Sequence, residues 1–172
     1  MKKYLTFIIC LILAGNLVAQ EKYPIPVRTS DQKHNRTLGQ FWVVSAAGIN
    51  FAKAHGVTPL EYGKYIGNLF APSWGAGNDF DAYVKGSIFN LENFRHVSDA
   101  VLTVKENQDG SVSIISNDKM WHKYIPDGNP YASYNEFLEY LKGVNEPIAN
   151  HMGATIVTEI KDTLLIFTLK KK

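Results

Sequence analysis

The spacing of the apolar residues changes near residue 100, and this change constrains the fold more than any other feature of the chain. From about residue 30 to residue 93, apolar side chains recur every three or four positions, which is typical of helices. From Ala100 to Ser116 they alternate with polar side chains, which is typical of strands. One more helical pattern and one more alternating pattern follow. Because helices and strands occur in separate blocks, the sequence predicts an α+β fold.

The first block predicts three helices, at residues 30–55, 58–71 and 80–93. Apolar residues occupy nearly all sides of the first helix, which predicts a buried central helix. In the second helix, Thr58 can cap the first turn, Pro59 suits the first helical position, and Glu61 can bond back to the Thr58 amide. Asn78 or Asp79 is expected to cap the third helix.

The remainder of the chain predicts two hairpins with a helix between them. Four strands are expected, at residues 100–106, 111–116, 155–160 and 164–169. Residues 107–110 form the turn of the first hairpin and residues 162–163 that of the second. Ser133 and Glu136 form a capping box that opens the intervening helix, which continues to about Met152. The prediction is a small four-stranded antiparallel sheet with helices packed on one face, in the order ααα-ββ-α-ββ.

The beginning of the chain has the features of a secretory signal peptide. Lys2 and Lys3 precede an apolar run at residues 5–14, which at about ten residues is too short to cross a bilayer of ~30 Å. Small and polar residues follow, so we predict cleavage after Ala19. We therefore expect an exported bacterial protein, periplasmic or secreted, with no membrane anchor after cleavage. The expected organisation is a signal peptide at residues 1–19, an extended leader at residues 20–29 and a single α+β domain at residues 30–172.

Cleavage would also set the charge and the thiol content of the mature chain. The whole sequence has 18 basic and 16 acidic residues, so the loss of Lys2 and Lys3 leaves 16 of each. With no excess of positive charge to attract a phosphate backbone, we expect no nucleic-acid partner. The single cysteine, Cys10, lies in the removed segment. The mature chain is therefore predicted to have no disulfide, no cysteine nucleophile and no cysteine-ligated zinc.

Short motifs for catalysis or metal binding are missing from the sequence. The five histidines lie far apart along the chain and form no HExxH-type pair. The sequence contains no GxSxG nucleophile motif and no glycine-rich phosphate-binding loop. We therefore assign no catalytic residue and expect no metal site and no cofactor.

Aromatic residues make up 12% of the chain, and many of them fall in loops and outside regular core positions. Loops that carry large aromatic side chains often line pockets or contact partners. Gly63 and Gly67 share one face of the second predicted helix, where another backbone or a flat ligand can approach closely. We predict a pocket between this helix and the sheet, beneath the aromatic loops. Its candidate ligand-binding residues are Tyr62, Tyr65, Trp74, Trp121 and His122.

Three functions remain open at this point. The first is an exported, non-enzymatic domain that binds a small apolar or aromatic ligand. The second is a protein-interaction module or homodimer whose exposed aromatic loops form the contact surface. The third is a cysteine-independent hydrolase, which needs a histidine and a carboxylate that converge in a cleft; His96 and His122 are the histidines to test.

The order of the predicted elements over residues 38–170, together with the closing strand pattern TIVTEIKDTLLIFTLKKK, resembles two families of small α+β domains. These are the amino-thiazoline-carboxylate hydrolase-like and the vinyl-reductase-like domains. The resemblance implies that helices precede a hairpin and that a late helix leads into a final hairpin. The cysteines common in those hydrolases are absent from the predicted mature chain, so no catalytic residue is carried over.

Overall fold

The computed structural model describes residues 26–95, 101–117, 130–161 and 164–172. The chain divides into two compact units, residues 1–33 and residues 34–172. In the first unit, residues 26–29 lead into the first turn of helix α2 (Ser30–Ala54). The Gln32 amide donates to Thr29 Oγ1 over 3.2 Å, and the Thr29 amide donates to Gln32 Oε1 over 3.1 Å. This reciprocal pair satisfies two amides that the helix leaves free, so it fixes the start of α2.

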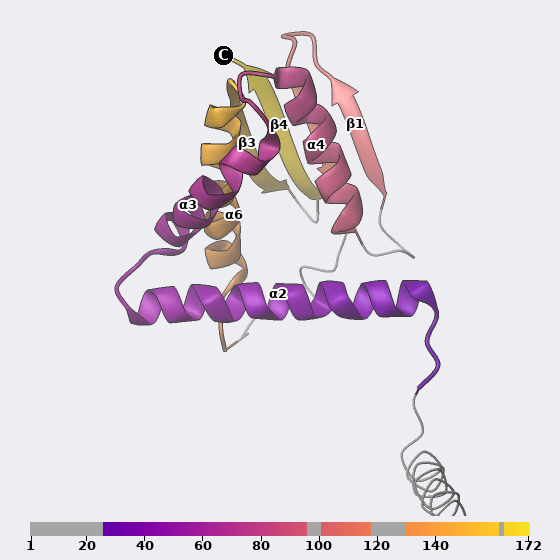
Figure 1. Ribbon diagram of the computed structural model, residues 1–172, viewed down its shortest axis with the longest axis vertical. Coiled ribbons are helices and arrows are strands. Elements are labelled where there is room, and N and C mark those ends of the chain that lie inside the picture. Colours follow the sequence, from indigo (N-terminus) through magenta and orange to yellow (C-terminus); the bar gives the residue numbers. More distant parts are fainter. Residues whose placement is uncertain (1–25, 96–100, 118–129, 162–163) are drawn as a thin grey trace, which may run out of the picture. The chain divides into compact units, whose positions relative to one another are not determined.

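The second unit has the predicted α+β architecture, with the helices before and between two hairpins (Figure 1). After α2 the elements are α3 (Pro59–Phe70), the short 3-10 helix η1 (Ala71–Trp74), α4 (Phe80–Asn93), β1 (Leu102–Glu106), β2 (Val112–Ser116), α6 (Tyr134–His151), β3 (Ala154–Lys161) and β4 (Leu164–Lys171). The order ααα-ββ-α-ββ and the fold class predicted from the sequence are therefore confirmed.

The four strands form one antiparallel sheet in the order β1-β2-β4-β3. In the middle of the sheet, Ile114 lies opposite Phe167, and Phe167 lies opposite Thr158. All three side chains are buried on the same face, because side chains along a strand alternate between the two faces. Helix α4 packs against β1, β2 and β4, and α6 packs against β3. On the opposite face of β3, Val157 is 59% exposed, so helices cover one face of the sheet, as predicted.

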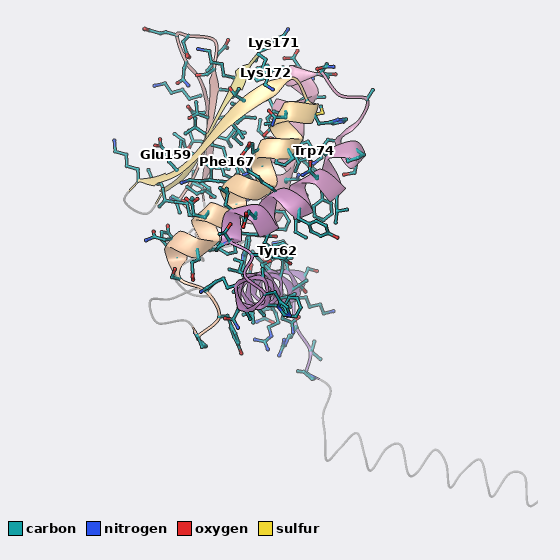
Figure 2. All side chains as sticks on the ribbon, turned by 90° about the vertical axis from the view of Figure 1, so that its left-hand side faces the viewer. Tyr62, Trp74, Glu159, Phe167, Lys171 and Lys172 are labelled. Carbon is teal, nitrogen blue, oxygen red and sulfur yellow. The ribbon has the colours of Figure 1, made fainter. Side chains whose placement is uncertain are left out.

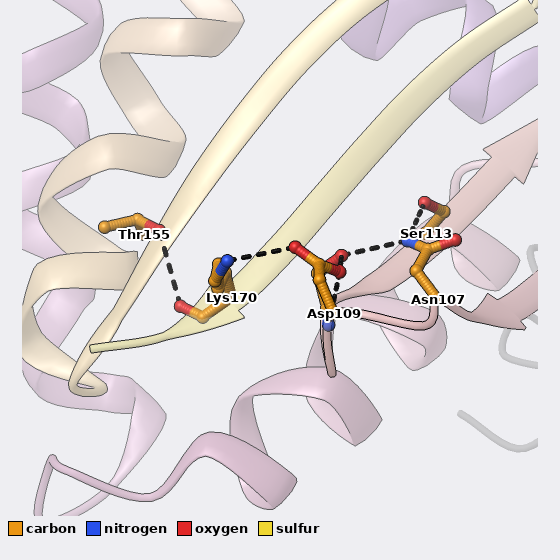
Figure 3. A network of polar contacts seen from close by, with 6 residues as sticks. Asn107, Asp109, Ser113, Thr155 and Lys170 are labelled. Carbon is orange, nitrogen blue, oxygen red and sulfur yellow. Dashed lines mark hydrogen bonds and ion pairs between the residues drawn. The ribbon is translucent and has the colours of Figure 1, made fainter.

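The turn between β1 and β2 is held by a network of polar contacts (Figure 3). Ser111 Oγ donates to Asp109 Oδ1 over 2.6 Å, and Lys170 Nζ of β4 donates to Asp109 Oδ2 over 2.9 Å. The Asn107 amide group donates to Ser111 Oγ over 2.9 Å. Gly110 adopts a φ of 75°, a conformation that glycine reaches without steric cost. The predicted turn at residues 107–110 is thus confirmed and is tied to the far hairpin.

Helix α2 is less buried than its composition predicts. Its buried side chains include Leu38, Trp42 and Ile49, which recur on one stripe. Val44 is 70% exposed and Phe51 is 66% exposed on other sides of the helix. The prediction of a buried central helix is therefore wrong. The rest of the unit covers α2 along one stripe only, and a helix that is apolar all round does not indicate which of its sides will be covered.

Helices α3 and α6 pack with their backbones in contact. A Cβ atom on Gly63 would overlap the carbonyl oxygen of Tyr140, and one on Gly143 would overlap the carbonyl oxygen of Leu60. A Cβ atom on Gly67 would likewise meet the backbone of α6. The small residues on α3 therefore serve the approach of a second helix, which is one of the two explanations that the sequence left open.

Candidate functional site

The second unit contains a partly open cavity of about 360 Å³. Small-molecule sites typically measure about 300–1,000 Å³. The cavity lies between the helices and the covered face of the sheet. Each neighbouring element contributes side chains, among them Trp42 of α2, Ile66 of α3, Leu91 of α4, Val144 of α6 and Leu165 of β4. The predicted position, between the second helix of the chain and the sheet, agrees with this location.

Helix α4 forms one wall of the cavity. Its lining residues share one face of the helix, because most of them are three or four positions apart. They are Tyr83, Ser87, Asn90 and Leu91. At the start of the helix, the Ala82 amide donates to the Asp79 carboxylate over 2.9 Å. Asp79 is thus the cap, one of the two residues expected for that role.

Helix α6 forms a second wall, to which it contributes Tyr140, Val144 and Asn145. The helix opens with the predicted capping box. The Glu136 amide donates to Ser133 Oγ over 3.3 Å, and the Ser133 amide donates to Glu136 Oε2 over 2.7 Å. On the cavity side, the Asn145 amide group donates to Thr158 Oγ1 of β3 over 3.5 Å. This contact connects α6 with the sheet at the edge of the cavity.

Trp74 is the last residue of η1, directly before the loop at residues 75–79, and it lines the cavity. Its ring lies 5.5 Å from the ring of Tyr83, with an angle of 58° between the ring planes. A Cβ atom on Gly86 would meet the edge of the indole at 2.7 Å, so the glycine allows the tryptophan to lie against α4. His151 Nε2 lies within hydrogen-bond distance of the Gly75 carbonyl oxygen, at 3.0 Å, and connects the loop to the end of α6.

A second group of aromatic rings lines the cavity where α2 meets the end of α4. The rings of Phe41 and Phe94 are stacked with their centroids 5.0 Å apart. Trp42 lies 5.7 Å from Phe94 and meets Phe137 edge to face at 5.4 Å. Such offset and edge contacts are the favoured arrangements of aromatic rings, so this part of the wall is tightly packed.

The environment in the cavity is apolar. None of the described residues that line it carries a formal charge at neutral pH. Burial, and to a smaller extent the nearby Tyr62, raise the pKa of the Tyr140 hydroxyl to about 12. Burial also raises the pKa of the Tyr83 hydroxyl well above its usual range, and a hydrogen bond with Ser87 opposes this shift. Both phenols therefore remain neutral at physiological pH, and the described lining residues offer no charge to a ligand.

The other predicted site residues take different positions. Tyr62 is not among the lining residues, but its ring stacks on that of the lining residue Tyr140, with centroids 5.5 Å apart. It lies where α3 passes α2 (Figure 2). Tyr65 is 63% exposed on the outer side of α3, away from the cavity. The capping box and the glycine contacts with α6 fix the rotation of α3, and this rotation turns Tyr65 outward. Trp121 and His122 lie outside the described residues.

Sequence reasoning missed two lining residues of α3, Ile66 and Phe70. They share a face with Gly63 and Gly67, because these four positions follow at steps of three, one and three residues. The glycine pair was the available signal, since it marks the side of α3 that faces the rest of the unit. The α4 residue Asn90 was also missed, and nothing in its local sequence distinguishes it from an exposed amide.

The three described histidines contact backbone carbonyl oxygens. His34 Nε2 lies 3.0 Å from the Arg95 oxygen, His55 Nδ1 lies 2.8 Å from the Phe51 oxygen, and His151 contacts Gly75 as described above. Within the described part of the chain, no group of three or more histidine, cysteine, aspartate or glutamate side chains is placed to hold a metal ion. These contacts give no support to the hydrolase hypothesis. His96 and His122 lie outside the described residues.

Across the described residues, no helix is both long enough and apolar enough to span a membrane. Comparison of the chain with family models, with curated proteins and with solved structures finds no match.

Proposed function

We propose that this protein is an exported, non-enzymatic domain that binds a small apolar or aromatic ligand in the cavity. The observation that carries the proposal is the size of the partly open cavity between the helices and the covered face of the sheet. Protein interiors are close-packed, and voids larger than a water molecule are few. A space of about 360 Å³ is roughly ten times the ~30 Å³ that a water molecule occupies. A space of this size can hold a small molecule.

The composition of the wall supports an apolar or aromatic ligand. Trp42, Trp74 and Phe94 lie at the cavity surface with their rings held by neighbouring aromatic residues. Rings held in this way offer a large contact area without loss of side-chain freedom on binding. Aliphatic side chains from α3, α4, α6 and the sheet complete the wall. A ligand with a flat or compact hydrocarbon body matches this surface.

Two measurements test the proposal. The first is native mass spectrometry of the protein purified from its own host, where we expect an adduct of small-molecule mass that is lost on denaturation. The second is calorimetric titration with naphthalene, a neutral aromatic hydrocarbon that fits the volume. We expect Trp74→Ala to weaken naphthalene binding about tenfold or more, because an aromatic contact and its buried area are lost.

Tyr65→Ala is the matched control, since it removes an aromatic side chain that lies on the outer side of α3. It should leave naphthalene binding unchanged, and circular dichroism should show that both variants are folded. If the wild-type protein binds no naphthalene, or if the two variants bind it equally well, the cavity does not have the proposed role.

Self-association through helix surfaces is the second candidate function, and the exposed face of α3 favours it. Tyr65 is 63% exposed and Leu69 is 61% exposed, one helical turn apart. Two copies of the chain that met on this face would cover both side chains. Light scattering of the wild type and of a Tyr65→Ser/Leu69→Ser variant tests this candidate. A mass of one chain for the wild type at high protein concentration would rule against it.

A further inference from the structure

The described residues of the cavity wall carry no charge and include a small number of polar groups. Several charged side chains of the second unit form ion pairs at exposed positions, for example Lys64 with Glu146 on α3 and α6, and Lys142 with Glu139 on α6. None of these four residues lines the cavity. A charged ligand group inside the cavity would lose its hydration and meet no opposite charge among the described lining residues. Such a transfer is strongly unfavourable.

Most of the polar groups in the wall already have partners. The hydroxyl of Ser87 bonds with the hydroxyl of Tyr83. The Asn145 amide group donates to Thr158. Ser116 of β2 also takes part in a contact within the chain. These groups satisfy one another, and they hold the wall in place more than they offer sites to a ligand.

Asn90 differs from these groups. It lies one turn beyond Ser87 on the cavity face of α4 and is partly buried there. Its backbone oxygen accepts a hydrogen bond from the Phe94 amide. Among the described residues, its side-chain amide has no hydrogen-bond partner. A side-chain amide carries both a donor and an acceptor. Because Asn90 is only partly buried, water can bond to this amide in the free protein, and a ligand group that replaces the water and bonds in the less polar surroundings gains affinity.

We infer that the cavity selects an uncharged ligand with an apolar or aromatic body and one hydroxyl or carbonyl group, which hydrogen-bonds to the side-chain amide of Asn90. This inference rests on the proposed function. The apolar body accounts for the area buried between Trp42, Trp74 and the aliphatic wall. The single polar group sets the orientation of the ligand, with its oxygen toward α4.

A series of ligands with one aromatic body separates the two parts of this inference. Naphthalene has no polar group, naphthol adds one neutral hydroxyl, and naphthoate adds a carboxylate that is charged at neutral pH. By calorimetry on the full protein at pH 7, we expect naphthol to bind about tenfold more tightly than naphthalene, the gain of one hydrogen bond. We expect naphthoate to bind at least about a hundredfold more weakly than naphthol, because its charge is buried without a partner.

Substitution of Asn90 tests the proposed hydrogen bond between the ligand and this side-chain amide. In Asn90→Leu, naphthol should lose about tenfold in affinity and bind no more tightly than naphthalene, whose own affinity should not change. Asn68→Leu is the matched control, because Asn68 is an exposed amide on α3 that bonds to the Lys64 carbonyl oxygen. It should leave the affinities of the whole series unchanged. Asn90→Ser provides a smaller change at the same position if the leucine variant does not fold.

The outcomes distinguish this inference from the function on which it rests. If naphthalene, naphthol and naphthoate all fail to bind, the proposed function itself fails. If naphthalene binds and naphthoate binds equally well, ligand binding stands but the selection against charge is refuted. If naphthol binds no better than naphthalene in the wild type, the hydrogen bond to Asn90 is refuted, and this comparison does not depend on any variant.

Discussion

The contact between α3 and α6 leads to the sharpest stability prediction, the substitution Gly143→Ala. The new Cβ atom would lie 2.9 Å from the Gly63 Cα atom and 2.9 Å from the Lys64 nitrogen, and it would overlap the Leu60 carbonyl oxygen. All three neighbours are backbone atoms of α3, so no side chain can rotate away. The two helices must separate, and overpacking of this kind costs about 1–3 kcal/mol or more.

The helix propensity of alanine acts against this loss of stability. Alanine favours the helix interior over glycine by about 1 kcal/mol, chiefly because glycine loses more backbone freedom on folding. The overlap of Gly143→Ala with rigid backbone should exceed this gain. We therefore expect the free energy of unfolding to fall by about 1–2 kcal/mol, as measured by urea denaturation followed by far-ultraviolet circular dichroism.

Gly48→Ala is the matched control, since Gly48 also lies inside a long helix. Its new Cβ atom would lie 2.7 Å from the hydroxyl oxygen of Tyr62, which is the far end of a side chain that can shift. For this variant, the higher helix propensity of alanine should outweigh the contact with Tyr62, and the free energy of unfolding should stay unchanged or rise. If Gly143→Ala is as stable as the wild type, the backbone contact between α3 and α6 is not as close as described, and the argument is refuted.

Two further predictions concern the β1–β2 turn and the cavity wall. The hydrogen bonds from Ser111 and then from Lys170 lower the pKa of Asp109 well below its usual range. This carboxylate therefore stabilises the folded state fully at a pH above its unfolded pKa of about 4, and it loses that contribution as the pH falls through its pKa in the folded state. Urea denaturation at pH 7 and pH 3 should therefore show a smaller loss of stability on acidification for Asp109→Asn than for the wild type, and an equal loss would contradict the role of this network. In the cavity wall, Leu91→Phe adds volume on the α4 side, and we expect it to weaken naphthalene binding in calorimetry while thermal denaturation shows an unchanged or higher midpoint; tighter binding by this variant would contradict the location of the site.

The sequence predicted the elements that carry local signals. The capping box at Thr58 and Glu61 is present, with the Glu61 amide donating to Thr58 Oγ1 over 3.2 Å, and α3 begins at the next residue, Pro59. The same applies to Ser133 and Glu136 at the start of α6. Such signals depend on residues three positions apart, so they do not require knowledge of the rest of the fold.

Features set by distant parts of the chain were predicted less well. The sheet order places β4 between β2 and β3, and the pairing of β2 with β4 joins residues that are about 50 positions apart in the sequence. No local pattern indicates this neighbour. The exposure of Val44 and Phe51 on α2 depends in the same way on how many sides of that helix the other elements cover. Composition predicts that these side chains are apolar but not that they remain exposed.

The two glycines of α3 connect the fold with the candidate site. Gly63 and Gly67 bring α3 against the backbone of α6, and the same helix face carries Ile66 and Phe70 into the cavity wall. The sequence offered close packing and ligand approach as alternative explanations of this face. The structure shows the close packing, and this contact on one edge of the face fixes the distance at which the larger side chains meet the cavity. A substitution such as Gly143→Ala, which separates α3 from α6, should therefore shift this part of the wall and weaken naphthalene binding along with stability.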